Sequence, residues 1–316
     1  MKAIAHQRYG SPEVLGLADV PKPTPKDNEV LIKLHATSVT AGDLKSRRGQ
    51  PFFLRFMSGL IRPKQHILGY EFAGEIEATG KDVTSFSKGD EVFGVTLAGG
   101  TNAEYMCLPE DGVLATKPHA ISYEQAAAGI SGAIVTFQAL KKYDVQSGRR
   151  VLIRGASGSL GSAAVQLAKH LGADVTAVCS TASVEMVRSL GADRVIDYRK
   201  EDYTKTGETY DLILDVTGRP SFSDGRGALR EHGVYVSSWP SLGFVFRVFW
   251  TSLIGNRKAR LMTENPGVES LRAVKEIIEA SELKPVIDRR YPLEHLAEAH
   301  MSLETGQKSG NVVVTI

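Results

Sequence analysis

The stretch from 151 to 171, with the sequence VLIRGASGSLGSAAVQLAKHL, constrains the fold of this chain more than any other. It opens with an aliphatic run at 151–153 of the kind buried in parallel sheets. Apolar residues then recur at helical spacing, and Gly172 predicts the end of that helix. The helical positions are Leu160, Ala164, Leu167, Ala168 and Leu171. The stretch therefore predicts a buried strand, a tight turn and a helix.

The turn contains the pattern A-x-G-x-x-G, formed by Ala156, Gly158 and Gly161. In this dinucleotide fingerprint small residues let the backbone approach a pyrophosphate, and N–H groups at the helix N-terminus bind its charge. A second strand at 174–179 completes a βαβ unit of the expected length. The context favours dinucleotide binding, and the alternative is a purely structural strand-to-helix turn.

Three further apolar runs follow at 195–198, 211–216 and 233–237, separated by connecting segments. This succession predicts an α/β fold with a doubly wound parallel sheet. Ligands bind such sheets outside the carboxyl ends of the strands. The residues expected on that rim are Ser180, Tyr198, Thr217 and Ser237. For Tyr198, packing against a strand end is the alternative to contact with an adenosine.

The end of the second strand bears on which dinucleotide binds. NAD-specific proteins place an acidic residue here to bind the ribose, but the first carboxylate in this chain is Glu185. The hydroxyls of Ser180 and Thr181 can instead donate to a 2′-phosphate, which favours NADPH. Ser180 as a helix cap is the alternative. The cations that could add charge are Arg188, Arg199 and Lys200.

Composition excludes several classes of protein. The 316 residues, 42% hydrophobic and 23% charged, are typical of a globular protein large enough for two domains. A net charge of +2 and short basic clusters at 45–48 and 257–260 predict solvated surface and no nucleic-acid partner. Two cysteines, Cys107 and Cys179, exclude a disulfide framework and a four-cysteine zinc lobe.

The chain also lacks targeting and membrane signals. Its first ten residues contain no apolar core of signal-peptide length, and 244–254 is too short to span a bilayer and is interrupted by Arg247. We therefore expect a soluble, cytoplasmic protein with no membrane partner.

The remaining segments predict how the chain is organised around the fingerprint. Short strands at 30–39, 68–79 and 91–95 indicate a compact, barrel-like lobe, and an alanine-rich helical segment begins at Ser122. The aromatic region 242–261 is typical of a core or a subunit contact, with the wall of a substrate pocket as the alternative. A helix with Leu271, Val274, Ile277 and Ile278 on one face follows, and we expect the terminal strand at 311–316 to return to the first lobe.

Several motifs in this order resemble the medium-chain dehydrogenase/reductase superfamily. They are GDLKSRRG, LGYEFAGEIEATGKDV, KGDEVFG, AEYMCLPEDG, VLIRGASGSLG and LGADRVIDYRKED. More narrowly, the chain is similar to the zinc-free, NADPH-dependent quinone oxidoreductase and enone reductase branch. The resemblance implies a GroES-like catalytic domain at 1–121, a Rossmann domain at 122–262, a C-terminal return at 263–316, and a homodimer.

Zinc-dependent members carry a cysteine before an early aspartate and a histidine–glutamate pair after a glycine. Here these places read Ala41-Gly42-Asp43 and Gly69-Tyr70-Glu71. Without thiolate and imidazole a tetrahedral site cannot assemble, so we expect no metal and reject a zinc alcohol dehydrogenase.

The resemblance also assigns cofactor contacts. It implies that Ser157, Gly158, Ser159 and Leu160 surround the pyrophosphate, and the fingerprint adds Ala156 and Gly161 to this cofactor site. It places Ser180 and Tyr198 at the adenosine end, and the strand ends in the sequence add Thr181 and Thr217 to the predicted cofactor site. The family's threonine near the nicotinamide is displaced by one residue, to Thr136, and the usual lysine before the last strand is Asn311.

Without a metal, a conjugated acceptor is easier to reduce than a simple carbonyl, because hydride addition gives a delocalised enolate. We therefore expect hydride transfer from NADPH to an α,β-unsaturated carbonyl or a quinone. Lys45 is the candidate hydrogen-bond donor to the acceptor oxygen, and Tyr70 is a second candidate. The alternative for Lys45 is a solvent-facing lysine on a helix. Asp43 is expected to cap that helix. The competing hypothesis is a non-catalytic NADPH-binding protein that docks a partner through the aromatic region.

Overall fold

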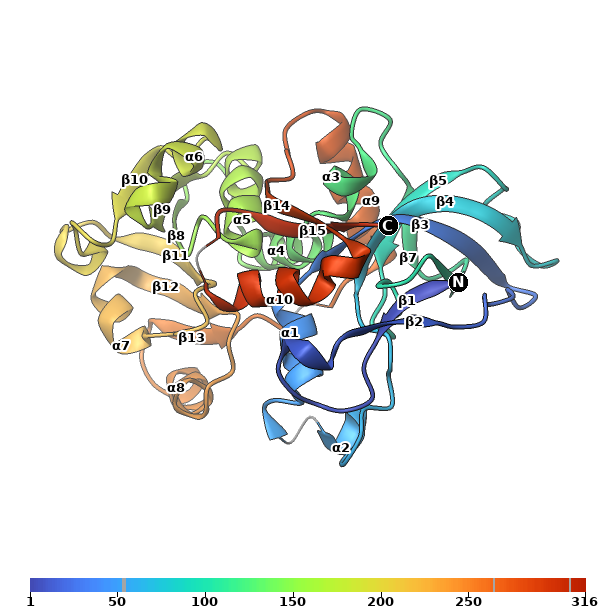
Figure 1. Cartoon of the computed structure of the whole chain (residues 1–316). Helices are drawn as coiled ribbons and strands as arrows, with labels where there is room; N and C mark the ends of the chain where they lie inside the picture. Colours follow the sequence, from blue (N-terminus) through green and yellow to red (C-terminus); the bar gives the residue numbers. More distant parts are fainter. Residues whose placement is uncertain (53–54, 264, 307) are drawn as a thin grey trace. The chain divides into compact units, whose positions relative to one another are not determined.

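The computed structural model describes residues 1–52, 55–263, 265–306 and 308–316. The chain forms two compact units, which we describe separately (Figure 1). The first comprises Met1–Ser131, Pro266–Glu279 and Pro285–Ile316, and the second Gly132–Asn265 and Ala280–Lys284. The chain therefore leaves the first unit, builds the second and returns. The limits 1–121, 122–262 and 263–316 drawn on the sequence stay a prediction.

The second unit is built on a six-stranded parallel sheet with the strand order β10-β9-β8-β11-β12-β13. Its strands are β8 (Arg150–Arg154), β9 (Asp174–Cys179), β10 (Arg194–Asp197), β11 (Tyr210–Asp215), β12 (Leu229–Ser237) and β13 (Lys258–Leu261). Counted from β8, the order is 3-2-1-4-5-6, that of Rossmann folds. The predicted doubly wound sheet is confirmed, and the direction of winding reverses between β8 and β11.

Helices connect these strands. They are α4 (Ile130–Lys142), which enters the unit, α5 (Ser159–His170), α6 (Val184–Ser189), α7 (Phe222–Gly225) and α8 (Leu242–Leu253). Short 3₁₀ helices lie at Thr181–Ser183, Tyr203–Lys205 and Arg226–Ala228. The side chains at 151–153 are completely buried, and Gly172 has a φ of +83°, the left-handed conformation that ends a helix. The predicted strand, turn and helix are confirmed.

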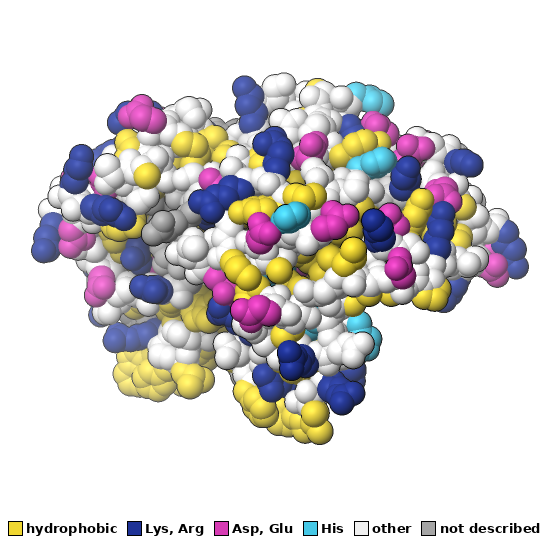
Figure 2. Space-filling model, viewed as in Figure 1, with side chains coloured by type: hydrophobic (Ala, Val, Ile, Leu, Met, Phe, Trp, Pro, Cys, Tyr) yellow, Lys and Arg dark blue, Asp and Glu magenta, His cyan; other side chains and the backbone are white. Residues whose placement is uncertain are grey.

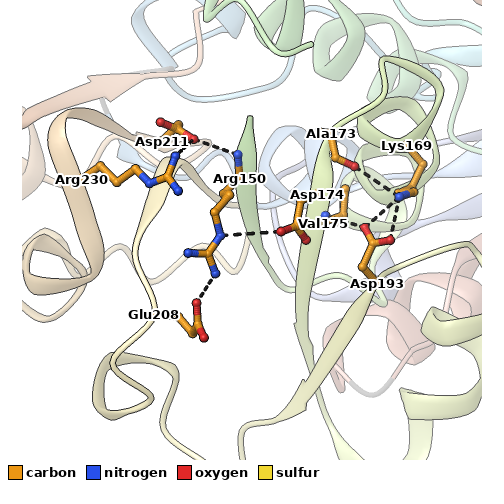
Figure 3. A network of polar contacts seen from close by, with 9 residues as sticks. All are labelled: Arg150, Lys169, Ala173, Asp174, Val175, Asp193, Glu208, Asp211 and Arg230. Atoms are coloured by element: carbon orange, nitrogen blue, oxygen red, sulfur yellow. Dashed lines mark hydrogen bonds and ion pairs between the residues drawn. The ribbon is translucent and has the colours of Figure 1, made fainter. Parts of the chain in front are cut away.

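Ion pairs and hydrogen bonds between charged residues connect the strands at the amino-terminal edge of this sheet (Figure 3). The Arg150 N–H donates to Asp211 Oδ2 at 2.8 Å, and its guanidinium pairs with Glu208 and lies 3.6 Å from Asp174. On the neighbouring connection, Lys169 Nζ lies 2.8 Å from Asp193. These interactions leave the opposite, carboxyl edge of the sheet for the candidate site.

The first unit contains a seven-stranded sheet in which β14-β15-β3-β4-β5-β7 lie side by side and β6 pairs with β3. Its strands are β3 (Glu29–Val39), β4 (Glu71–Thr79), β5 (Glu91–Val95), β6 (Tyr105–Pro109), β7 (Val113–Thr116), β14 (Ile287–Pro292) and β15 (Asn311–Thr315). A two-stranded sheet joins β1 (Lys2–Ala5) to β2 (Gly16–Asp19). Because β15 pairs with β3, the predicted return of the C-terminal strand is confirmed.

The helices of the first unit are α1 (Ala41–Arg48), α2 (Arg55–Ser58), α3 (Tyr123–Ala127), α9 (Val268–Glu279) and α10 (Leu296–Glu304). In the described part of this unit, 3₁₀ helices lie at Pro12–Val14 and Leu293–His295. The four apolar residues predicted on one face of α9 are all buried. The basic cluster at 45–48 is only partly surface: Arg47 is completely buried and pairs with Glu304 of α10, so the prediction was wrong for this residue.

The aromatic region 242–261 is where the structure departs most from the sequence prediction. It forms α8 and then β13, an edge strand that the sequence pattern did not reveal. Phe244 is buried against Tyr235, but most of the other large side chains of α8 are exposed. The expectation of a core segment is therefore wrong for this face of α8. Among the described residues, no helix combines the length and apolar character needed to cross a bilayer.

Candidate functional site

Backbone hydrogen bonds fix the turn between β8 and α5. Gly155 has a φ of +82°, and the N–H groups of Gly155 and Ala156 both donate to the Val178 carbonyl oxygen of β9 at 3.1 Å. The Gly158 N–H donates to the Gly155 carbonyl oxygen, also at 3.1 Å. The turn is thereby held against the end of β9 at the carboxyl edge of the sheet.

The two glycines of the fingerprint differ in whether packing within the chain leaves room for a side chain. A Cβ atom on Gly161 would lie 2.1 Å from the Gly155 carbonyl oxygen and 2.7 Å from the Ala156 Cα, so packing within the chain requires this glycine. Among the described residues, the nearest neighbour of a Cβ on Gly158 would be the Gly155 carbonyl oxygen at 3.5 Å, an ordinary contact. Packing among the described residues does not require glycine at 158, which is the position where the motif needs a ligand to approach the backbone.

The N-terminus of α5 offers donors without a capping side chain. Gly158 is the N-cap and provides no side-chain hydrogen bond, and the Ser162 N–H makes a helix bond to the Gly158 carbonyl oxygen at 2.9 Å. The N–H groups of Ser159, Leu160 and Gly161 precede that bond, where helix geometry provides no intrahelical acceptor. With the positive end of the helix dipole they form an anion-binding end that fits a pyrophosphate.

Thr217 lies beside this turn, because β11 is the neighbour of β8. Its backbone N–H and its hydroxyl both donate to Oδ1 of the buried Asp215, at 3.0 and 2.6 Å. The other carboxylate oxygen accepts from Arg154 Nη1 at 2.6 Å and from the Tyr235 hydroxyl. Burial and Asp215 together raise the pKa of Tyr235, which keeps its phenol protonated. Thr217 is therefore fixed at the point where the winding of the sheet reverses.

The predicted adenosine end contains a carboxylate that the sequence analysis missed. Asp197, the last residue of β10, is paired in register with Cys179 at the end of β9. The Thr181 hydroxyl donates to Asp197 Oδ2 at 2.7 Å, an interaction that occupies the hydroxyl expected to serve a phosphate. The parallel register, which a single sequence does not reveal, places this acid next to Ser180 and Thr181. The sequence argument from the lack of a nearby acid therefore does not hold in three dimensions.

Cations also surround Asp197. The pKa of Asp197 is lowered first by the Thr181 hydrogen bond, then by the Arg199 N–H and by the charges of Lys200 and Arg199. Lys200 Nζ lies 3.9 Å from the carboxylate. Arg188, the third predicted cation, instead pairs with Glu185 at 2.5 Å. Positive charge at this end of the site comes from residues 199 and 200.

The other two predicted residues here, Ser180 and Tyr198, have accessible side chains. The alternative that Ser180 caps the helix with Val184 and Val187 is wrong, because the N-cap of that helix is Ser183. The Ser180 side chain also makes no capping bond to the 3₁₀ helix Thr181–Ser183, and its Oγ lies 3.4 Å from Ser183 Oγ. The Tyr198 N–H donates to the Cys179 carbonyl oxygen at 3.1 Å while its ring is exposed. The ring is not buried against the strand end.

Thr136 lies in α4 and is completely buried. Its hydroxyl has no hydrogen-bond partner among the residues that the structure describes. A buried hydroxyl without a partner is costly, so a polar ligand group is the kind of neighbour that would stabilise it.

In the first unit, α1 carries the predicted catalytic lysine. Thr40 is its N-cap and Asp43 is the N3 residue of a capping box, with Asp43 Oδ2 accepting from the Thr40 N–H at 2.8 Å. Asp43 Oδ1 accepts from the Gly69 N–H at 2.9 Å, which connects the helix to the residue before Tyr70. Burial raises the pKa of Asp43 to about 6 despite these hydrogen bonds. The expected capping role of Asp43 is confirmed.

Lys45 and Tyr70 are both partly buried. Burial lowers the pKa of Lys45. Burial also raises the pKa of Tyr70, and its hydroxyl lies 2.6 Å from Ser46 Oγ on α1. The phenol therefore stays protonated and is connected through Ser46 to the helix that carries Lys45.

Glu71 occupies the position of a zinc-site glutamate in the superfamily pattern, but here it is a hydrogen-bond acceptor within the fold. Its buried carboxylate accepts from the N–H groups of Gly129 at 3.1 Å and Ser131 at 2.9 Å, and from the hydroxyls of Ser38 and Ser131. In the described part of the chain, no three His, Cys, Asp or Glu side chains are grouped to hold a metal ion. The donors around Glu71 fit a structural carboxylate.

The first unit also contains a groove of about 650 Å³ between β7 and α9. Its lining includes Glu110, Arg272 and Lys275, and none of the predicted site residues. The groove is separate from the chemistry described above.

Comparison with known proteins shows the family of this chain. Residues 26–118 match the alcohol dehydrogenase GroES-like domain, and residues 190–314 match a zinc-binding dehydrogenase family. The chain is 32% identical to the 2-methylene-furan-3-one reductase of Solanum lycopersicum, over 99% of this chain and 79% of that protein. This chain belongs to the medium-chain dehydrogenase/reductase superfamily.

Two further relatives place the chain within the superfamily. It is 32% identical to an NADPH-dependent alkenal/one oxidoreductase, chloroplastic, of Arabidopsis thaliana, over 99% of this chain and 79% of that protein. The structure of the quinone oxidoreductase from Coxiella burnetii superposes with a TM-score of 0.89 at 31% identity, covering 100% of this chain and 99% of that one. The predicted quinone oxidoreductase branch of the superfamily is confirmed.

Proposed function

We propose that this protein is an NADPH-dependent reductase that transfers hydride to a quinone or an α,β-unsaturated carbonyl without zinc. The names of the relatives support this reaction class. The observation that carries the proposal is the N-terminus of α5. Its first N–H groups have no capping side chain, and its N-cap, Gly158, is a glycine that packing among the described residues does not require.

The cofactor fits the residues of the second unit. Ser157, Gly158, Ser159 and Leu160 hold the pyrophosphate, with Ala156 and Gly161 shaping the turn and Thr217 fixed beside it by Asp215. The buried hydroxyl of Thr136 is the candidate contact at the nicotinamide end. When bound, NADPH supplies the hydride.

Lys45 and Tyr70 act on the acceptor. Both side chains can donate a hydrogen bond, and a donor at the acceptor oxygen stabilises the negative charge that develops as hydride arrives at a conjugated carbon. Lowering of the Lys45 pKa by burial makes its proton easier to release to the reduced product. We assign Lys45 as the main donor and Tyr70 as the second.

Preference for NADPH over NADH is part of the proposal. Lys200 and Arg199 provide cations beside the ribose end, and Ser180 provides a hydroxyl, whereas Asp197 opposes a 2′-phosphate. Asp197→Asn, which removes the opposing charge, should increase the ratio of NADPH to NADH affinity. Fluorescence titration with each coenzyme measures this ratio, and an unchanged ratio would contradict a role of Asp197 in the preference.

The reaction is tested by following NADPH oxidation with a panel of quinones and enones. We expect turnover in the absence of added metal, and a large fall in kcat for Lys45→Met with partial recovery in Lys45→Arg. Lys64→Met, which changes an exposed lysine of the same unit, is the matched control. Saturable NADPH binding without turnover on any acceptor would favour the non-catalytic alternative. Stoichiometric zinc together with loss of activity in chelator would contradict the zinc-free mechanism.

Two further expectations come from the sequence, the first from the family resemblance and the second from the lack of targeting signals. A homodimer and a cytoplasmic location stay predictions, which analytical ultracentrifugation and cell fractionation can test.

A further inference from the structure

Helix α8 presents a continuous apolar surface. Leu242 is 92% exposed, Phe246 and Phe249 are each 63% exposed, and Leu253 is 67% exposed. Trp250 and Ile254 are also exposed, and the rings of Phe246 and Trp250 stack with their centroids 6.3 Å apart. Figure 2 shows hydrophobic side chains gathered over α8. Such a surface on a single helix indicates an interaction site.

The exposed residues lie on one side of the helix. They recur at positions 242, 246, 249, 250 and 253, which is the spacing of a single helical face. The opposite face carries Phe244 and Thr251, which are buried, and Val248, which packs on the core of the second unit. The helix is therefore anchored to its own unit by one face while the other has no cover within that unit.

Basic residues border this face on both flanks, and Glu231, which accepts a hydrogen bond from Asn256 at 2.9 Å, lies beyond its C-terminal end. By helical spacing Arg247 lies on one flank, and on the other flank Ser252 accepts a hydrogen bond from Arg260 Nη1 at 3.1 Å. The following segment adds Arg257 and Lys258, and the sequence has no Asp or Glu from 232 to 263. An apolar face with cations on both flanks is complementary to a partner whose apolar interior lies beneath an outer layer of negative charge.

In place of the sequence expectation of no membrane partner, we propose that α8 docks on an anionic lipid bilayer and lies in the plane of the membrane surface. In this arrangement the apolar face enters the boundary between headgroups and acyl chains, while the arginines reach the lipid phosphates. A tryptophan on the apolar face suits the same boundary, where its ring is apolar and its N–H meets water. At about 1.5 Å per residue, the 12 residues of α8 span about 18 Å and cannot cross a hydrocarbon core of about 30 Å.

The first unit contains a second segment with the same chemistry. Phe52, Phe56, Leu60 and Ile61 are exposed, and the sequence from 44 to 70 contains no Asp or Glu. Arg47 and Arg48 both pair with Glu304, so the basic charge of this segment comes from Arg55, Arg62 and Lys64. The occurrence of exposed aromatic side chains within acid-free, basic sequence in both units favours a shared electrostatic partner.

Charge also decides between a membrane and a second copy of the chain. A symmetric pair formed through α8 would bring the same face of each copy together, and with it the basic flanks of both. Like charges at such an interface are unfavourable, whereas anionic headgroups neutralise them. The basic flanks therefore favour lipid as the occupant.

Vesicle flotation and tryptophan emission test the proposal on the full-length protein. The chain has two tryptophans, so Trp239→Phe leaves Trp250 as the single reporter on α8. Vesicles of phosphatidylcholine alone are compared with vesicles of phosphatidylcholine and phosphatidylserine. We expect flotation with the anionic vesicles, a blue shift of Trp250 emission on binding, and weaker binding at high salt, because screening reduces the attraction.

Variants separate the two contributions. Phe246→Ser with Phe249→Ser should reduce binding at least about tenfold through lost apolar burial, and Arg247→Gln should reduce it about fivefold. Leu97→Ser, an exposed leucine of the first unit, is the matched control and should bind normally. Thermal unfolding confirms that each variant is folded.

Two results would overturn the proposal. The first is the absence of binding to anionic vesicles at low salt. The second is concentration-dependent dimerisation that the double serine variant abolishes while vesicle binding is lacking, which would make a second copy the occupant of α8. Binding is read without turnover, so its failure is distinguishable from failure of the proposed reductase activity.

Discussion

Helices α5 and α8 have the same length of 12 residues and lie in the same unit, but their surroundings are opposite. In α5 all residues from 161 to 168 are buried, whereas α8 buries Phe244 and Thr251. The buried residues of α5 are mostly small, with alanine at 163, 164 and 168, which lets the helix approach the sheet closely. Those of the exposed face of α8 are large and aromatic. An apolar sequence thus predicts that a face will be covered but does not identify what covers it.

The largest expected difference in the free energy of unfolding is between substitutions on the two faces of α8. Phe244→Ala should lower the free energy of unfolding by about 3–5 kcal/mol, because it opens a cavity beside Tyr235. Phe249→Ala, the same substitution on the exposed face, should change it by less than about 0.5 kcal/mol. Urea denaturation measures both. Similar losses for the two variants would mean that Phe249 is covered in solution.

A second pair compares the two helices directly. Leu167→Ala in α5 should cost about 2–5 kcal/mol, since the side chain is completely buried. Leu253→Ala in α8 removes the same atoms from an exposed position and should be close to neutral. A large cost at Leu253, measured by the same denaturation, would remove the distinction between the helices.

The start of α5 can be tested through packing. Gly161→Ala should lower the free energy of unfolding by about 1–3 kcal/mol, because the new methyl group would clash with the Gly155 carbonyl oxygen. Gly243→Ala in the first turn of α8, where no atom lies within 4 Å of the new Cβ, is the control and should not destabilise the fold. Thermal or urea unfolding that leaves Gly161→Ala as stable as the parent protein would contradict the close contact.

The smallest expected effect on stability, and the most specific for function, concerns Gly158. Gly158→Ala should change the free energy of unfolding by less than about 0.5 kcal/mol, because the nearest described neighbour of the new Cβ lies 3.5 Å away. It should weaken NADPH binding about tenfold or more, as the methyl group occupies the path by which a pyrophosphate approaches the backbone. Isothermal titration measures the affinity. Unchanged affinity would mean that the phosphates do not contact this turn.

Local features of the fold could be predicted from the sequence, because neighbouring residues determine them. The run at 151–153, the small residues of the turn and Gly172 specify strand, bend and helix end within about twenty residues. The face of α9 with Leu271 and Val274 was equally clear, since helical spacing alone selects it. For the candidate site, this local information identified the fingerprint turn.

Features that depend on distant residues could not be predicted in the same way. Asp197 lies beside Thr181 only because β10 pairs with β9 in one particular register. Arg47 is buried because its partner, Glu304, lies in α10 far along the chain. The edge strand β13 has few apolar residues to signal it and forms by pairing with β12.

The sequence by itself determined the strand, the glycine turn and the helix that begin the second unit, since steric limits on the backbone and the spacing of apolar residues act over short distances. Tertiary structure alone decided that Asp215 fixes Thr217, that Glu71 is satisfied by donors from its own unit, and that one face of α8 stays exposed. The physical reason is that burial and hydrogen bonding depend on which surfaces meet, and the meeting of surfaces is a property of the folded chain.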